Sequence, residues 1–167
     1  MLGKSISDPA EVESIGKESG LSLLEIQTEL RKNKETHQIK ALLFNQKKGS
    51  NLVLEGYEIH MGNTEYMDQT KPLFRLEERG GDKAELDDGA ISNNGKVWGS
   101  YIHGLFENGD FRKQVLDEIR LEKGIPLNGQ AVKSYADIKE EGFKKLAELV
   151  RKNVDMEKMC RAVGFAI

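Results

Sequence analysis

Short apolar runs in the first two thirds of the chain predict a β-rich region. Each run is bounded by Gly, Pro, Asn, Asp or Ser, as strands usually are. The strands expected from this pattern cover residues 21–28, 37–44, 51–60, 72–77 and 96–102. The polar stretch 29–35 predicts a loop, and the Gly- and Asp-rich stretch 79–95 predicts a loop or a small hairpin. Residues 1–6 have the pattern of the tail of a helix.

The last third has helical spacing of its apolar residues instead. Residues 110–123 predict a first helix, ended by Gly124. Residues 134–153 predict a longer one, and Asp155 is placed to cap a third. In that third helix we expect Cys160 to lie in a packed apolar face, because methionines surround it in the sequence. Strands followed by helices favour an α+β order.

Length and composition restrict the possible classes of protein. A chain of 167 residues fits one domain, and 25 basic against 28 acidic side chains give a net charge of −3. This balance predicts neither nucleic acid nor an anionic membrane surface as a partner. With Cys160 as the only cysteine, no internal disulfide can form, and we expect a cytoplasmic protein. The acidic residues at 82–88 lack the spacing of a calcium loop, so we expect no metal site.

Two motifs carry a resemblance to a known family. The first is GYEIHMG at residues 56–62, and the second is GSYIHGLF at residues 99–106, followed by ENGDFR. Together they resemble the glutamine amidotransferase domain of the cobyric acid synthase family. Related cobyrinic acid a,c-diamide synthases have similar motifs, but the amino-acid sequence of the first motif fits the cobyric acid synthases better.

The resemblance implies an α/β fold of the class I glutamine amidotransferase type. We expect a flavodoxin-like, three-layer arrangement with a mostly parallel sheet, missing its first strands, and a helical C-terminal part. Residues 1–167 are then one partial amidotransferase domain. Loss of the first strands would leave apolar strand faces and an open edge, so we expect a homodimer or pairing with a partner strand.

The N-terminus resembles part of the family's nucleophile motif. Met1-Leu2-Gly3 corresponds to the end of a C-G-G-x-Q-M-L-G elbow, which places the nucleophilic cysteine before residue 1. Cys160 is rejected as its replacement, because it lies in a helical apolar pattern and not on a Gly-rich elbow. We therefore expect the chain alone to be inactive.

The resemblance assigns the catalytic imidazole to His103. In such domains a thiolate attacks the side-chain amide of glutamine, and the imidazole takes up and later delivers a proton. Gly104 permits a sharp turn directly after this histidine. Many class I amidotransferases carry an orienting glutamate two residues further on, where this chain has Leu105. This family shares that departure, and the sequence names no other orienting group.

Three residues of the first motif are weaker candidates for binding the substrate: Tyr57, Glu58 and His60. For His60 the structural alternative, a bond from the ring to a backbone carbonyl, is favoured. Tyr57 is expected in the core, and Glu58 is expected to bond to a loop or to help fix the site. His37 is expected at the surface.

The activity implied by the resemblance is glutamine hydrolysis that supplies ammonia to an ATP-dependent synthetase domain. That domain amidates the corrin adenosylcobyrinic acid a,c-diamide. The glycines at 80, 81 and 89 form no phosphate loop, because no G-K-[ST] follows them, so ATP and Mg²⁺ belong to the synthetase part and no cofactor is expected here. Alternatives are an inactive interaction module of the same fold, an a,c-diamide synthase, or the glutaminase that modifies lipid II.

Overall fold

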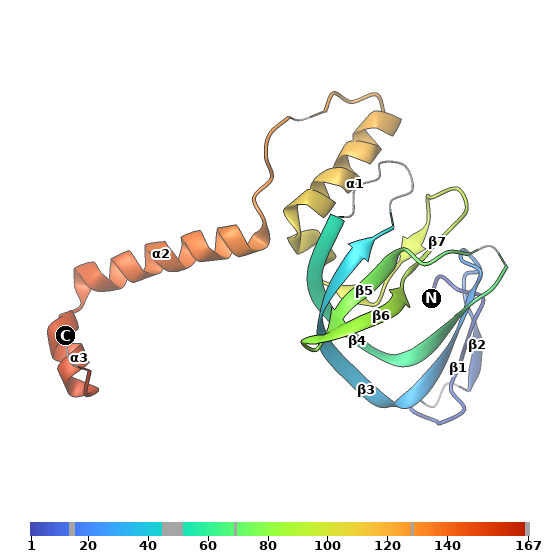
Figure 1. The fold of residues 1–167 in the computed structure, drawn as a ribbon, viewed down its shortest axis with the longest axis horizontal. Helices are drawn as coiled ribbons and strands as arrows, with labels where there is room; N and C mark the ends of the chain where they lie inside the picture. Colours follow the sequence, from blue (N-terminus) through green and yellow to red (C-terminus); the bar gives the residue numbers. More distant parts are fainter. Residues whose placement is uncertain (14–15, 45–51, 69, 128, 166–167) are drawn as a thin grey trace.

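The computed structural model describes residues 1–13, 16–44, 52–68, 70–127 and 129–165. Within these ranges, a curled β-sheet forms a body from which two helices extend as an arm (Figure 1). The strands are β1 (Ser5–Ser7), β2 (Lys17–Ser19), β3 (Ile26–Leu43), β4 (Leu52–Tyr66), β5 (Phe74–Arg79), β6 (Asp82–Asp88), β7 (Ala90–Ile91), β8 (Trp98–Gly99) and β9 (Ile102–His103). The helices are the 3₁₀ turn η1 (Leu105–Glu107), α1 (Gly109–Glu122), α2 (Tyr135–Asn153) and α3 (Met156–Ala162).

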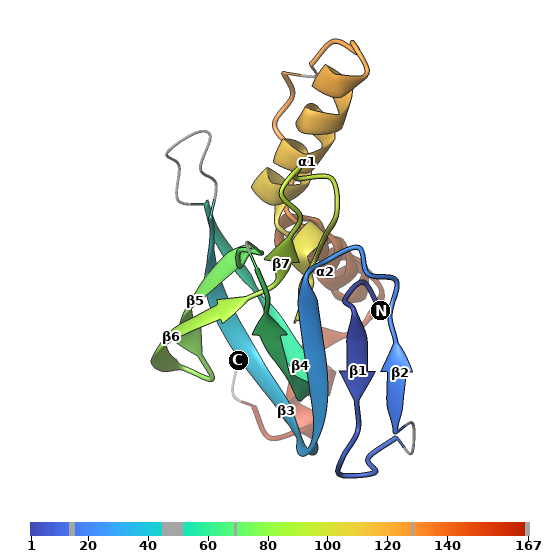
Figure 2. The same ribbon diagram turned by 90° about the vertical axis from the view of Figure 1, so that its right-hand side faces the viewer.

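The main sheet follows the order β2-β1-β3-β4-β9. β1 pairs with the first part of β3, whereas β5 pairs with its last part, and β6 pairs with β5. Only the β1–β3 pairing is parallel among the strand pairs that the described ranges contain. Figure 2 shows β3 and β4 crossing the whole body, with β1 and β2 on one side and β5 and β6 on the other. A separate two-stranded pair joins β7 to β8.

The fold confirms the α/β class and the helical C-terminal part. The expected mostly parallel arrangement differs from the sheet seen here, because successive strands are joined by hairpin connections, and these produce antiparallel neighbours. Residues 1–6 are not the tail of a helix. Their backbone is bonded across the chain instead, as from Lys4 N to the Ile26 carbonyl at 2.8 Å, and β1 begins at Ser5.

The prediction of a loop over residues 29–35 is wrong. β3 runs through this stretch and pairs with β4 from Ile26–Tyr66 to Leu43–Leu52, with a register shift between Leu30 and Glu35. Pairing with β4 overrides the polar composition, since strand preference depends on what lies across the ladder. For the stretch 79–95 the sequence predicted a loop or a small hairpin. The structure has a hairpin there, because β6 pairs with β5.

The core lies on one face of the curled sheet. Ile39, Ala41 and Leu43 alternate along β3 and are all buried, which is the period of two that one face of a strand requires. They pack with buried residues from the other strands and from the turn after β9, namely Leu54, Leu73, Phe74, Leu76, Ile102, Leu105 and Phe111. The core therefore reaches the segment on both sides of His103.

Helix α1 is held to the sheet by its first turn. Phe111 is buried there and lies in an aromatic cluster, 6.1 Å between ring centroids from Phe74 and 6.0 Å from Trp98. Leu116 and Ile119, which share the predicted apolar pattern, are exposed. Thus α1 fixes the chain that follows the second motif, while its far end leaves the body.

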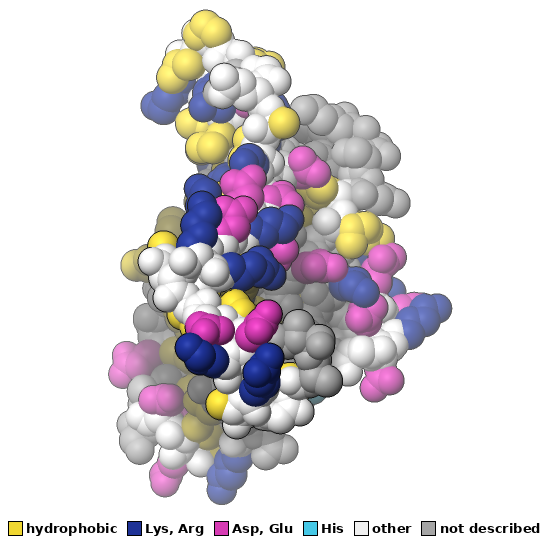
Figure 3. All heavy atoms as spheres, turned by 90° about the vertical axis from the view of Figure 1, so that its left-hand side faces the viewer, with side chains coloured by type: hydrophobic (Ala, Val, Ile, Leu, Met, Phe, Trp, Pro, Cys, Tyr) yellow, Lys and Arg dark blue, Asp and Glu magenta, His cyan; other side chains and the backbone are white. Residues whose placement is uncertain are grey.

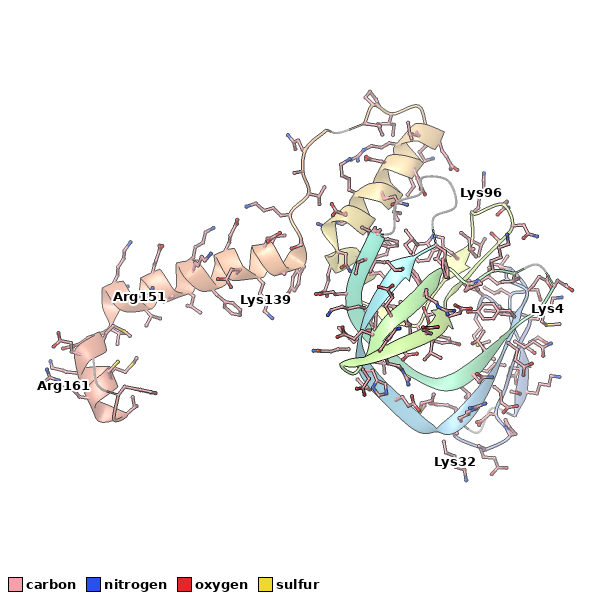
Figure 4. The ribbon with its side chains drawn as sticks, in the orientation of Figure 1. Lys4, Lys32, Lys96, Lys139, Arg151 and Arg161 are labelled. Atoms are coloured by element: carbon pink, nitrogen blue, oxygen red, sulfur yellow. The ribbon has the colours of Figure 1, made fainter. Side chains whose placement is uncertain are left out.

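The arm is formed by α2 and α3, and neither helix has a buried residue among those described. Ser134 and Asp137 form a reciprocal capping box at the start of α2, and Asp155 caps α3 as predicted. Side chains of α2, Lys139 and Arg151 among them, project to all sides of the helix (Figure 4). Seen from the arm's side of the molecule, acidic and basic side chains are interspersed with hydrophobic ones (Figure 3).

The expectation that Cys160 lies in a packed face is wrong. Its helix has no buried residue, and Met159 is 43% exposed. The apolar spacing in this helix is real, but Cys160 itself is only partly buried.

Candidate active site

His103 lies at the end of β9, where the chain leaves the sheet. Its strand pairs with β4 through Tyr57–His103 and Glu58–Ile102. Ile102 and Leu105 are buried in the core on either side, and His103 is exposed between them. Gly104 has φ of 81°, a conformation that favours glycine and turns the chain into η1. The anchored neighbours therefore hold the imidazole outward at a fixed point of the backbone.

The orientation of the imidazole is set by a backbone group. His103 Nδ1 lies 3.0 Å from the Tyr101 carbonyl oxygen. A carbonyl oxygen only accepts hydrogen bonds, so in the neutral imidazole this contact favours the tautomer with the proton on Nδ1 and the lone pair on Nε2. A neutral histidine in this tautomer can accept a proton at Nε2, as a general base must.

Tyr57 is part of the surroundings of His103. The two rings stack with centroids 5.7 Å apart and an interplanar angle of 16°. The expectation that Tyr57 is a core residue is wrong, because its side chain is 42% exposed. The core belongs to the opposite face of β4, where Leu54 points. Of the three weaker candidates, Tyr57 is the one that the structure places against the imidazole.

Glu58 faces away from His103, because consecutive strand residues alternate. It is buried, and its Oε2 accepts from Arg79 Nε at 2.7 Å. Arg79 also bonds Glu35 and holds the pKa of Glu35 below its ordinary value. The predicted partner was a loop, whereas the structure shows an ion pair across the sheet to β5.

The remaining histidines lie elsewhere. The backbone of His60, in β4, pairs with Glu35 of β3, and the side chain of His60 lies outside the described part of the structure. His37, expected at the surface, is partly exposed, with Nε2 3.6 Å from a Glu35 carboxylate oxygen. Neither residue has a described contact with His103.

Gly56 explains why the two motifs occur together. A Cβ added at Gly56 would lie 2.5 Å from the His103 carbonyl oxygen and 2.9 Å from Ile102. The backbones of β4 and β9 thus approach more closely than any side chain at this position allows. The glycine that opens the first motif makes room for the histidine strand of the second.

Gly56→Ala is expected to lower the free energy of unfolding of the body by about 1–3 kcal/mol, because the added methyl overpacks the contact with β9. Urea unfolding measures the loss, and amide shifts of Ile102 and His103 report the displaced strand. Gly142→Ala in α2 is the matched control, since nothing lies within 4 Å of its added Cβ. Unchanged stability and unchanged shifts in Gly56→Ala would contradict the close approach.

Asn108 organises the turn after His103, and sequence reasoning assigned it no role. Its side-chain amide accepts from Glu55 N at 3.0 Å and donates to the Glu55 carbonyl at 2.8 Å. The same Nδ2 lies 3.3 Å from the Gly104 carbonyl oxygen. Asn108 therefore ties the chain just beyond the imidazole to the edge of β4. Its place inside the second motif was the only available signal.

The first three residues lie close to the second motif. Loop residues 21–24 bond to their backbone, as from Leu23 N to the Leu2 carbonyl at 2.9 Å. A Cβ added at Gly99 would lie 3.1 Å from Leu2 Cδ1. Met1, Leu2 and Gly3 also line a cavity of about 770 Å³ inside the curled sheet, together with Tyr101. The stretch that resembles the end of the elbow therefore lies beside the strand that leads to His103.

The described residues contain neither a candidate metal site nor a candidate membrane-spanning helix. No three His, Cys, Asp or Glu residues there are grouped as a metal site requires. None of the helices described is both long and apolar enough to cross a membrane.

Comparison with known proteins identifies the family. The model of the CobB/CobQ-like glutamine amidotransferase domain matches residues 1–111. Cobyric acid synthase from Clostridium botulinum strain 657 is 39% identical over 165 residues, which cover 98% of this chain and 33% of the relative. The enzymes of that name from Thermoanaerobacter sp. strain X514 and Streptococcus sanguinis strain SK36 are 40% and 41% identical over 166 residues.

These matches cover the motifs and the arm to different extents. The family model ends at residue 111, in the first turn of α1, whereas the similarity to the cobyric acid synthases extends over nearly the whole chain. The chain spans about a third of the length of these curated relatives. The chain belongs to the CobB/CobQ-like glutamine amidotransferase domain family.

Proposed function

We propose that this chain is part of the glutaminase module of a cobyric acid synthase, with His103 as its catalytic base. The observation that carries the proposal is the His103 imidazole, exposed at a strand end with Nδ1 on the Tyr101 carbonyl and Nε2 left as the acceptor. The identity of 39–41% to cobyric acid synthases over nearly the whole chain supports the choice of enzyme.

The proposed reaction is glutamine hydrolysis through a thioester. His103 Nε2 takes the proton of a cysteine thiol, and the thiolate attacks the amide carbon of the glutamine side chain. The protonated imidazole then delivers its proton to the departing ammonia, and water releases glutamate. Tyr57 forms one wall beside the imidazole, and we propose that it contacts the glutamine substrate. Roles for Glu58 and His60 in binding glutamine stay predictions.

The nucleophile in this proposal comes from a polypeptide segment outside residues 1–167. Cys160, the single cysteine of the sequence, belongs to α3, and α3 lies at the end of the arm, away from the sheet of the body (Figure 1). The position of Met1–Gly3 beside Gly99 supports entry of that segment next to residue 1. Ammonia passes to an ATP-dependent synthetase part, which holds ATP and Mg²⁺ and amidates the corrin carboxylates.

An inactive interaction module is the second candidate, and the arm favours it. Ile138, Phe143, Leu146 and Leu149 of α2 are each more than half exposed. An apolar helix stripe of this kind is typical of a surface that binds another polypeptide. Binding without catalysis would need the fold and the arm but not the tautomer of His103.

Co-expression with the polypeptide encoded immediately upstream tests the proposal. We expect the two to purify together through one tag and to release glutamate from glutamine, whereas this chain alone releases none. Co-purification without glutamate release would favour the interaction module. Glutamate release by this chain alone would contradict the assignment of the nucleophile to another segment.

A further inference from the structure

The turn that leads into His103 rests on one buried carboxylate. Asp88, at the end of β6, is 5% exposed. Its Oδ1 accepts a hydrogen bond from Ser100 Oγ, and its Oδ2 lies 3.4 Å from Tyr101 N. Ser100 Oγ in turn accepts from Ile102 N at 2.9 Å. Three successive residues before the imidazole are thereby tied, directly or through one hydroxyl, to Asp88.

Tyr101 is also held at the far end of its side chain. Its hydroxyl lies 2.8 Å from Thr64 Oγ1 and 3.3 Å from Thr28 Oγ1, and the two threonine hydroxyls are 3.1 Å apart. Thr28 and Thr64 are directly opposite on β3 and β4. Ile102 N–H shares a peptide plane with the Tyr101 carbonyl and donates to Ser100 Oγ, and the Tyr101 side chain is held on the long strand pair, so this carbonyl has little freedom to rotate.

The position of the Tyr101 carbonyl decides the state of the imidazole. A histidine without such a contact samples both neutral tautomers, and only the one with the proton on Nδ1 has its acceptor at Nε2. A group that fixes this carbonyl acts on the proton transfer without touching the substrate. The triad aspartate of serine hydrolases holds a histidine in the required tautomer by direct contact.

We propose that Asp88 is a positioning residue for His103: it fixes the Ser100–Tyr101 turn so that the Tyr101 carbonyl holds the imidazole with its proton on Nδ1. The catalytic value of this arrangement rests on the proposed function of His103 as the base. Because Leu105 stands where many class I amidotransferases have an orienting glutamate, the backbone carbonyl takes over that task here.

The Asp88 carboxylate is buried and bonded to donors, unlike a solvated carboxylate at the surface. Burial raises the pKa of its carboxyl above the ordinary value, and the bonds from Ser100 and Tyr101 oppose that rise. Tyr66 on β4 donates its hydroxyl to the Gly89 carbonyl at 2.7 Å, which clamps the residue after Asp88. An acidic group kept in the interior is costly unless donors surround it, as they do here.

Imidazole nitrogen NMR on this chain alone tests the proposal. The sequence has three histidines, so ¹⁵N-labelled ring signals can be assigned by His37→Gln and His60→Gln variants. For the neutral imidazole of the native chain, we expect His103 to show a protonated-type shift at Nδ1 and an unprotonated-type shift at Nε2. In Asp88→Ala we expect the two shifts to converge, as in a mixture of tautomers.

Conservative and control variants separate positioning from general damage. Asp88→Asn should restore the native pattern, because its amide can accept from Tyr101 N–H and donate to Ser100 Oγ. Asp87→Ala removes the neighbouring exposed carboxylate, which bonds Arg75, and should leave the His103 shifts unchanged. If Asp88→Ala does not fold, Ser100→Ala removes the hydroxyl that joins Asp88 to Ile102 N, and the two His103 shifts should again converge.

Native shifts in a folded Asp88→Ala or Ser100→Ala variant would overturn the proposal, as would an Nε2–H pattern in the native chain. The NMR measurement involves neither glutamine nor a nucleophile. The NMR result can show the predicted tautomer even if glutamate release by the partnered enzyme does not depend on His103. That combination would contradict the proposed function and would leave the positioning role of Asp88 intact.

Discussion

His103→Ala is expected to lower glutamate release by the partnered enzyme by at least about 10²–10⁴-fold, the usual contribution of a positioned general base. The imidazole is exposed and stacks on Tyr57, which is itself 42% exposed, so its removal takes little from the core. Affinity for the upstream polypeptide and the urea midpoint of the variant should therefore stay close to the native values. The loss should appear in kcat, because the base acts on the thiol and on the departing ammonia.

His37→Ala is the matched control for this loss. His37 lies in β3, and its described contact is with Glu35 at the edge of the strand pair. Its removal should leave glutamate release near the native rate. Equal losses in the two variants, or an unimpaired His103→Ala enzyme, would contradict the role of His103 as the base.

Phe74→Ala is expected to lower the free energy of unfolding by about 3–5 kcal/mol, the largest stability change of any single variant considered. Phe74 has no exposed surface and joins β5 to α1 through Phe111. The cavity left behind would lie in the middle of the core cluster, where neighbouring strands cannot collapse without losing their pairing. Since domains are stable by only about 5–15 kcal/mol, much of the variant should be unfolded in mild urea.

Phe143→Ala in the arm provides the comparison for this loss. Phe143 is 55% exposed on α2, a helix with no buried residue. Its removal should change the free energy of unfolding of the body by less than about 0.5 kcal/mol, as for surface positions generally. Equal effects of the two changes would show that the arm shares the core, contrary to the fold described here.

Local signals succeeded where the chain decides its own structure. The capping residues Ser134 and Asp155 and the spacing of apolar residues placed all three α-helices to within a residue or so. Gly104 marked the turn after His103, and it has the positive φ that such a turn uses. These features depend on neighbours within four residues, which a sequence displays directly.

The predictions that failed for residues 29–35 and for Tyr57 depend on pairing between strands that are distant in the sequence. Residues 29–35 are polar, yet they continue β3 because β4 lies opposite, and no local pattern reveals that partner. Tyr57 was expected in the core, but the register of β4 turns it toward His103. The group that orients the imidazole was invisible for a different reason: it is a backbone carbonyl, and every residue has one.

Covalent trapping with a glutamine-like electrophile tests the central claim most directly, that His103 serves a nucleophile carried by another segment. The enzyme partnered with the upstream polypeptide would be treated with a diazoketone analogue of glutamine, digested, and mapped by mass spectrometry. We expect one label on a cysteine of the partner segment, slowed strongly by His103→Ala, and none on this chain alone. A label on Cys160, in either preparation, would contradict the claim.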